Sequence, residues 1–132
     1  MILLDTQVLI WLLSNDSRLG PEARQAIDQA WAEEEAAVSA FSFWEIAMLH
    51  SKGRMTLLRD VEMWRLSVLD AGLIEIPPSG RIAVRAGLLE DMHGDPADRI
   101  IVATALEGHR LVTADQGILD WSGALDRMDA RT

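Results

Sequence analysis

Four acidic side chains stand where the chain has the pattern of a strand leading into a helix. Asp5 follows the apolar run at the start of the chain, and Asp115 follows a second apolar run. Glu45 and Asp98 fall near the beginnings of segments with helical periodicity. Carboxylate oxygens without histidine or cysteine ligands are the donors that Mg²⁺ and Mn²⁺ prefer. If the fold gathers these four carboxylates, they predict a divalent-cation site suited to phosphodiester hydrolysis.

Such a cluster needs a positive partner. Like charges repel and an unpaired buried carboxylate is costly, so folding alone would not collect four of them. A divalent cation would neutralise the cluster and lower the pKa of a bound water. The hydroxyls of Thr6, Ser39, Ser42 and Thr113 are close enough in sequence to hold a carboxylate or a water. Helix caps and strand ends also use hydroxyls, so both roles stay open for each of them.

Helix capping is the competing explanation for two of the acids. Asp95 fits an N-cap and Pro96 the first helical position, which begins a helix running to Leu106. Asp98 lies three residues after Asp95, the spacing of a capping box, and acids in a first turn are favoured by about 0.3–1 kcal/mol. Ser42 to Glu45 has the same spacing, which predicts a helix capped by Ser42 with Glu45 in its first turn.

Helical and extended patterns alternate along the whole chain. Alternation of this kind builds parallel strands whose faces are covered by helices, and such sheets bind ligands at the carboxyl ends of their strands. Strand patterns cover 1–4, 36–40, 73–76 and 110–114, and the tail from 124 has weak strand character. Helical patterns cover 7–13, 21–35, 42–53, 60–71, 79–91, 96–106 and 118–121. The four acids are therefore expected to converge on one edge of the sheet.

Composition narrows the class of protein. The 132 residues, 49% hydrophobic and 25% charged, predict one globular domain spanning 1–132. No cysteine is present, which excludes disulfides and thiolate catalysis. No apolar run approaches the ~18 residues of a membrane span and the first residues lack a signal-peptide pattern, so we expect a cytoplasmic protein with no membrane partner. A net charge of −9 counts against nucleic-acid binding unless bound cations reverse the local sign.

Four segments in combination resemble the PIN-domain ribonucleases, and within them the VapC-type toxins of type II toxin–antitoxin pairs. These segments are LLDT (3–6), VSAFSFWEIAMLHSKGRM (38–55), HGDPADRIIVATAL (93–106) and LVTAD (111–115). The resemblance spans nearly the whole chain. It implies a single PIN domain with a three-layer α/β/α fold and a central, mainly parallel sheet of four to five short strands.

The resemblance also implies an activity and a site. Asp5, Glu45, Asp98 and Asp115 would be the catalytic and metal-binding acids, with Thr6 and Thr113 as supporting hydroxyls. The implied reaction is Mg²⁺-dependent endonucleolytic cleavage of RNA of the tRNA or rRNA class, with Mn²⁺ as a possible substitute. Such toxins usually form homodimers and are silenced by a cognate antitoxin protein.

Accessory residues are less defined by the sequence. Candidate RNA-binding cations are Lys52, Arg54, Arg85 and Arg99. Candidate aromatic side chains for an antitoxin segment, or equally for the core, are Trp11, Trp44 and Trp64. His93 could serve as an acid for the leaving group, although a loop histidine making an ordinary hydrogen bond is the simpler interpretation.

Two other classes of function remain to be compared. A phosphatase of the aspartyl-phosphate type would use a strand-end acid such as Asp5 as nucleophile. Such an enzyme usually has a second acid two residues later, where this chain has Gln7, and no well-placed lysine follows. A non-catalytic interaction module would use the acids only as caps, so that Asp98→Asn would lower stability by ~1 kcal/mol without any metal dependence.

Overall fold

The computed structural model describes residues 1–132 and is built on a five-stranded parallel sheet. The strands are β1 (Ile2–Leu4), β2 (Ala36–Ser39), β3 (Ile74–Ile76), β4 (Arg110–Thr113) and β5 (Arg127–Asp129). Their spatial order is β3-β2-β1-β4-β5, with β1 in the centre. Because every pairing is parallel, the carboxyl ends of all five strands meet at one edge.

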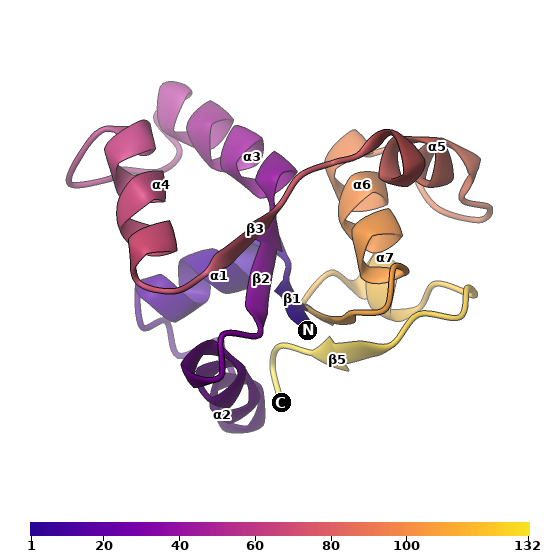
Figure 1. Cartoon of the computed structure of the whole chain (residues 1–132), viewed down its shortest axis with the longest axis horizontal. Coiled ribbons are helices and arrows are strands. Elements are labelled where there is room, and N and C mark those ends of the chain that lie inside the picture. Colours follow the sequence, from indigo (N-terminus) through magenta and orange to yellow (C-terminus); the bar gives the residue numbers. More distant parts are fainter.

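Seven helices cover the two faces of this sheet. They are α1 (Thr6–Leu13), α2 (Pro21–Ala32), α3 (Ala40–Ser51), α4 (Val61–Asp70), α5 (Gly80–Leu88), α6 (Pro96–Ala105) and α7 (Gln116–Leu119). Helices α1 to α4 lie on one side of the strands and α5 to α7 on the other (Figure 1). None of these helices combines the length and apolar character needed to cross a lipid bilayer.

The three inner strands are short, and their buried side chains are mostly apolar, which creates a core on each face. Leu4, Val38 and Val112 point toward α1 to α4 and belong to one buried cluster. Their neighbours Leu3 and Leu111 belong to a second cluster with residues of α6 and α7. Successive side chains of a strand point to opposite faces, so a strand buried on both faces must be apolar throughout. The predicted three-layer α/β/α fold with a parallel sheet is confirmed.

Helix α6 begins as its sequence predicts. The Asp95 carboxylate accepts hydrogen bonds from the backbone N–H groups of Ala97 (2.9 Å) and Asp98 (3.3 Å), and Pro96 occupies the first helical position. Ile101 and Val102 are fully buried, as their spacing predicts. The first turn of α6 thus lies at the carboxyl edge of the sheet.

The predicted start of α3 is wrong. Ser39, the last residue of β2, is the N-cap, and its hydroxyl accepts from the N–H of Phe41 at 3.1 Å. The strand passes into the helix without a loop, so the helix begins at Ala40 and Ser42 is already inside it. Glu45 therefore lies in the second turn and takes no part in a capping box.

The end of the chain also differs from its pattern. Helix α7 begins at Gln116 rather than at 118, and the weakly patterned tail forms the edge strand β5. Earlier in the chain, α2 ends at Ala32 rather than at the predicted residue 35. Strand β5 pairs in parallel with β4, and the segment after it donates from Ala130 N–H to the Thr113 carbonyl at 2.8 Å. A three-residue, half-buried edge strand is too short to show alternation, so only its partner determines it.

Arg99 of α6 fastens the segment between α5 and α6. Its guanidinium donates to five backbone carbonyls, those of Ala86, Gly87, Leu89, Met92 and His93, at 2.9–3.3 Å. A planar cation with five donors suits these carbonyls, because they lie in the last turn of α5 and the segment after it, where no intrahelical N–H is available to them.

We predict that Arg99→Met destabilises the protein by roughly 2–3 kcal/mol, because charge-assisted hydrogen bonds are lost and several carbonyls are left unpaired. Chemical denaturation measures this, and amide hydrogen exchange should rise first in residues 87–95. Arg59→Met, at an exposed arginine without an ion pair, is the control and should change stability little. Equal stability of the two variants would contradict the assignment.

Candidate active site

All four sequence-predicted acids line one cleft of about 400 Å³. Asp5 and Asp115 come from the ends of β1 and β4, Asp98 from the first turn of α6 and Glu45 from α3. The cleft opens at the carboxyl edge, as expected for a parallel sheet. The structure therefore brings together residues that are up to 110 positions apart in the chain.

Asp5 is the most buried of the four, with 6% of its surface exposed. It is the N-cap of α1, and one carboxylate oxygen accepts from Thr6 N–H at 2.8 Å. The other oxygen accepts from the Thr113 hydroxyl at 2.6 Å. Burial raises the pKa of Asp5, with smaller contributions from the charges of Asp115 and Asp95, and the hydrogen bonds from Thr113 and Thr6 oppose the rise.

Thr113 also connects Asp5 with Asp115. Its hydroxyl donates to Asp5 and accepts the backbone N–H of Asp115 at 3.0 Å. Asp115 in turn caps α7 by accepting from Ile118 N–H at 3.2 Å. One buried hydroxyl thus sets the spacing between two acids on neighbouring strands.

Glu45 is held by the helix that follows β1. The Thr6 hydroxyl donates to the Glu45 carboxylate and makes a second hydrogen bond, 2.8 Å long, with the Ser42 hydroxyl. Burial raises the pKa of Glu45, and the negative charges of Asp5 and Asp95 add to the rise. Thr6 and Thr113 therefore both contact acids of the cleft, as the supporting role implied by the resemblance requires.

Asp98 points into the cleft and does not return to cap its own helix. Its side chain is 15% exposed, and one carboxylate oxygen lies 3.3 Å from His93 Nε2. Burial and then the charges of Asp5, Asp95, Asp115 and Glu45 raise the pKa of Asp98 to about 8. A shift of this size, caused mainly by burial among other acids, is typical of functional carboxylates.

His93 lies against Asp98, with its Nε2 3.3 Å from one carboxylate oxygen. Its Nδ1 accepts from the backbone N–H of Asp95 at 3.3 Å, so in the neutral ring the proton resides on Nε2, which faces Asp98. Polar atoms of His93, Asp98 and Asp115 lie within 4.8 Å of one another. The sequence had indicated an ordinary hydrogen bond for His93, and the structure shows one, accepted from the Asp95 N–H, together with a contact to Asp98 in the cleft.

No lysine or arginine forms an ion pair with any of the four acids; the eight ion pairs in the molecule involve other carboxylates or His93. Burial, with repulsion between the acids, raises the pKa values of three of them, so the protein disfavours their charged forms and supplies no lysine or arginine to offset that cost. Oxygen donors with uncompensated charge fit a hard divalent cation.

Residues 2–122 match the PIN domain family. Ribonuclease VapC22 of Mycobacterium tuberculosis is 39% identical to this chain over 117 residues, which is 87% of each protein. The chain belongs to the PIN-domain family. The predicted family and fold are thus confirmed by sequence as well as by architecture.

Solved structures agree on the architecture of this PIN domain. A toxin–antitoxin complex from Klebsiella pneumoniae superimposes with a TM-score of 0.64 at 24% identity over 98% of each chain. VapBC2 of Rickettsia felis, bound to a DNA fragment from its promoter, gives 0.62 at 18% identity over 87% of this chain and 89% of that one. At these identities the likeness shows the fold alone.

Sequence reasoning missed the cations of the cleft. Arg18 and Arg131 line it, and neither stood out in the sequence because both lie in segments without periodicity. Among the cations that had been singled out, Arg99 is bound to backbone carbonyls and Arg85 pairs with Glu107 at 2.8 Å. A signal existed in the repeated Asp-x-Arg spacing, which appears at 16–18 and 129–131.

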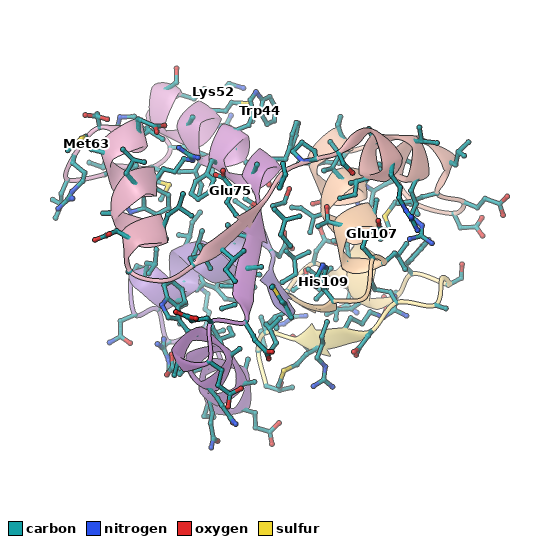
Figure 2. All side chains as sticks on the ribbon, in the orientation of Figure 1. Trp44, Lys52, Met63, Glu75, Glu107 and His109 are labelled. Carbon is teal, nitrogen blue, oxygen red and sulfur yellow. The ribbon has the colours of Figure 1, made fainter.

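The remaining candidates lie outside the cleft or form its wall. Lys52 and Arg54 are exposed near the end of α3. Lys52 and, nearer the start of this helix, Trp44 both lie on the outside of the molecule (Figure 2). Trp44 is 52% exposed, whereas Trp11 is buried and forms part of the cleft wall. Trp64, a residue of α4, is partly buried and packs against the core.

We predict that the metal-free protein becomes less stable as the pH rises. Folded Asp98 keeps its proton up to about pH 8, whereas an unfolded aspartate loses it near pH 4, so the stabilisation is complete at low pH and disappears through that interval. Thermal unfolding in EDTA should show a Tm roughly 3–6 °C lower at about pH 8 than at about pH 5.5. Asp98→Asn should flatten this dependence, and an unchanged slope would contradict the assignment.

We predict that Thr113→Val destabilises the protein by roughly 1.5–3 kcal/mol, although it nearly preserves volume. The change removes the donor to Asp5 and leaves the Asp115 N–H without its acceptor. Denaturant titration measures the loss. Thr104→Val is a matched control, because that buried hydroxyl bonds only to the Ile100 carbonyl of its own helix, and it should cost distinctly less.

Proposed function

We propose that this PIN domain is a metal-dependent endoribonuclease that acts as the toxin of a toxin–antitoxin pair. The observation that carries the proposal is the convergence of Asp5, Glu45, Asp98 and Asp115 on one cleft without a compensating lysine or arginine ion pair. The relation to a protein named Ribonuclease VapC22, at 39% identity, supports the reaction class.

We further propose Mg²⁺ as the ion, with Mn²⁺ as a substitute, held by carboxylates of the four acids. Bound there, the cation would supply an acidified water and charge stabilisation at phosphorus. The protein's own residues orient the ligands: Thr113 holds Asp5, Thr6 holds Glu45 and His93 holds Asp98. Fixing the carboxylates in advance lowers the cost of reorganising them when substrate binds.

The two competing functions have less support. In an aspartyl-phosphate mechanism Asp5 would attack phosphorus, but both of its oxygens accept hydrogen bonds and only 6% of the residue is exposed. In a non-catalytic module Asp98 would cap α6, but its carboxylate faces His93 instead and Asp95 provides the cap. Both observations favour a metal-binding active site.

The partners belong to the same proposal. Structured RNA of the tRNA or rRNA class would be the substrate. A cognate antitoxin would be the inhibitor, which the toxin–antitoxin complex among the structural relatives supports. We also propose a homodimer acting in the cytoplasm, with residues 1–132 as one functional unit. Exposed Val84 and Leu88 on α5 provide apolar surface for a protein partner.

The decisive experiment incubates the purified protein, free of any antitoxin, with total RNA and either Mg²⁺, Mn²⁺ or EDTA. We expect cleavage at discrete positions with either metal and none with EDTA. Asp5→Asn and Asp98→Asn should each lower the cleavage rate by at least about a hundredfold, since a ligand is lost. Asp70→Asn, an exposed residue of α4, is the matched control. Intact RNA under all metal conditions would overturn the proposal.

Metal binding should also appear as stabilisation. At a Mg²⁺ concentration about 100-fold above its Kd, the free energy of unfolding of the wild type should rise by about 2.7 kcal/mol. Asp98→Asn should respond much less, while at a pH above about 8 its metal-free form should be at least as stable as the wild type, because ionised Asp98 repels the other acids there. Differential scanning calorimetry with and without Mg²⁺ makes the measurement.

A further inference from the structure

The acidic cleft has two arginines in its wall. Arg18 and Arg131 are the only lysine or arginine residues that line it. Arg18 lies between α1 and α2, and Arg131 follows β5 near the other end of the chain. The two cations thus share the cleft with four carboxylates but form no ion pair with them.

Backbone hydrogen bonds hold the two arginine segments side by side. Gly20 N–H donates to the Ala130 carbonyl at 2.8 Å, and Glu22 N–H donates to the Thr132 carbonyl at 3.0 Å. A Cβ on Gly20 would lie 2.2 Å from the carbonyl carbon of Thr132, so only glycine allows this approach. The juxtaposition of the arginines is therefore built into the fold.

Each arginine is held by the same local arrangement. Asp16 accepts from the backbone N–H and the Nε of Arg18 at 2.9 and 3.1 Å, and Asp129 does the same for Arg131 at 2.9 and 3.1 Å. The second oxygen of each aspartate accepts from Nη2. In both cases Nη1 has no protein partner, so each guanidinium is fixed along one edge and free at the other.

Each guanidinium makes one further contact that fixes its orientation in the cleft wall. The Arg18 guanidinium stacks 5.1 Å from the ring centre of Trp11, and Arg131 Nη2 donates to the Gln116 side chain, next to Asp115, at 3.3 Å. Trp11 is itself a wall residue, and its buried indole N–H has no acceptor in the protein. The ring of Trp11 therefore acts on the cleft through its face, on which the Arg18 guanidinium is held.

We propose that Arg18, Arg131 and Trp11 form a phosphate-binding rim that receives an RNA phosphate adjacent to the one at the acidic residues. This inference rests on the proposed nuclease function. A guanidinium fixed on one edge offers the other to phosphate oxygens with little loss of side-chain entropy. Trp11 contributes by stacking on the Arg18 guanidinium, which holds that cation in the cleft wall.

The charge distribution favours RNA over an acidic peptide as the occupant. Arg18 and Arg131 line the same cleft as the four acids, so a bound chain must present groups for both. A nucleic-acid backbone repeats its phosphates at short intervals, with one at the metal-binding carboxylates and the next at the rim. An acidic peptide would bring further carboxylates to a cluster that already lacks compensation.

The test measures RNA affinity separately from cleavage. Fluorescence anisotropy of a labelled single-stranded RNA of mixed sequence is recorded in EDTA and in Ca²⁺ over a range of salt concentrations. Arg18→Gln and Arg131→Gln should each raise Kd about tenfold, because a charge-assisted hydrogen bond is lost. Each should also reduce the slope of log K against log salt by about 0.7. Arg59→Gln makes the same charge change at an exposed site outside the cleft and should alter neither.

Two further variants separate positioning from charge. Arg131→Lys keeps the charge without the planar fork, so it should retain the salt slope but bind RNA several-fold more weakly. Trp11→Leu removes the aromatic face that holds the Arg18 guanidinium, so it should weaken RNA binding several-fold and leave the salt slope unchanged, since no charge is lost. These variants keep the proposal testable if the glutamine variants fold poorly.

The outcomes distinguish this inference from the function on which it rests. If the wild type neither cuts nor binds RNA, the nuclease proposal fails. If it cuts and binds RNA but Arg18→Gln and Arg131→Gln behave like Arg59→Gln, only the rim is refuted. A labelled polyglutamate peptide tests the acidic-peptide alternative. If Arg18→Gln and Arg131→Gln keep their RNA affinity but lose binding of this peptide, the rim binds an acidic protein partner and the RNA proposal is overturned.

Discussion

Repulsion among four carboxylates in a partly buried cleft is the constraint around which this molecule is organised. The protein stabilises them with neutral donors, because no lysine or arginine pairs with them. Peptide N–H groups at the start of α1 and α7 bond to Asp5 and Asp115, and hydroxyls of Thr6 and Thr113 bond to Glu45 and Asp5. Helix N-termini also carry partial positive charge, which favours anions at this edge. These neutral donors stabilise the carboxylates but do not neutralise their charge.

The sheet makes this concentration of charge possible. Five parallel strands deliver their carboxyl ends to one edge, and the helices that follow begin there, so acids from distant segments meet without a long loop. The apolar clusters on both faces hold the short strands in register. Stability is therefore located in the two core layers, while the edge gathers acids whose burial and mutual repulsion raise the pKa values of Asp5, Glu45 and Asp98.

The arginines of this protein fall into two groups, those that hold the fold together and those that line the cleft. A chain of net charge −9 has little general attraction for a polyanion, so affinity must come from a few positioned groups. Arg99 is used to hold the loop that carries His93, and Arg85 to hold Glu107. The two arginines in the cleft wall, by contrast, have unused donors. The division separates cations that maintain the fold from those available to a ligand.

The sequence by itself determined the parallel α/β architecture, the start of α6 at Asp95 and the positions of the strand-end acids. Apolar runs, caps and their spacing are local patterns, and a parallel sheet converts such patterns into a shared edge. Only the tertiary structure decided between Ser39 and Ser42 as the cap of α3, and only it formed β5 against β4. It also decided that Asp98 faces His93 rather than its own helix, and that residues 18 and 131 are neighbours of one cleft. These features depend on contacts between groups far apart in the chain, whose energies no local window of sequence contains.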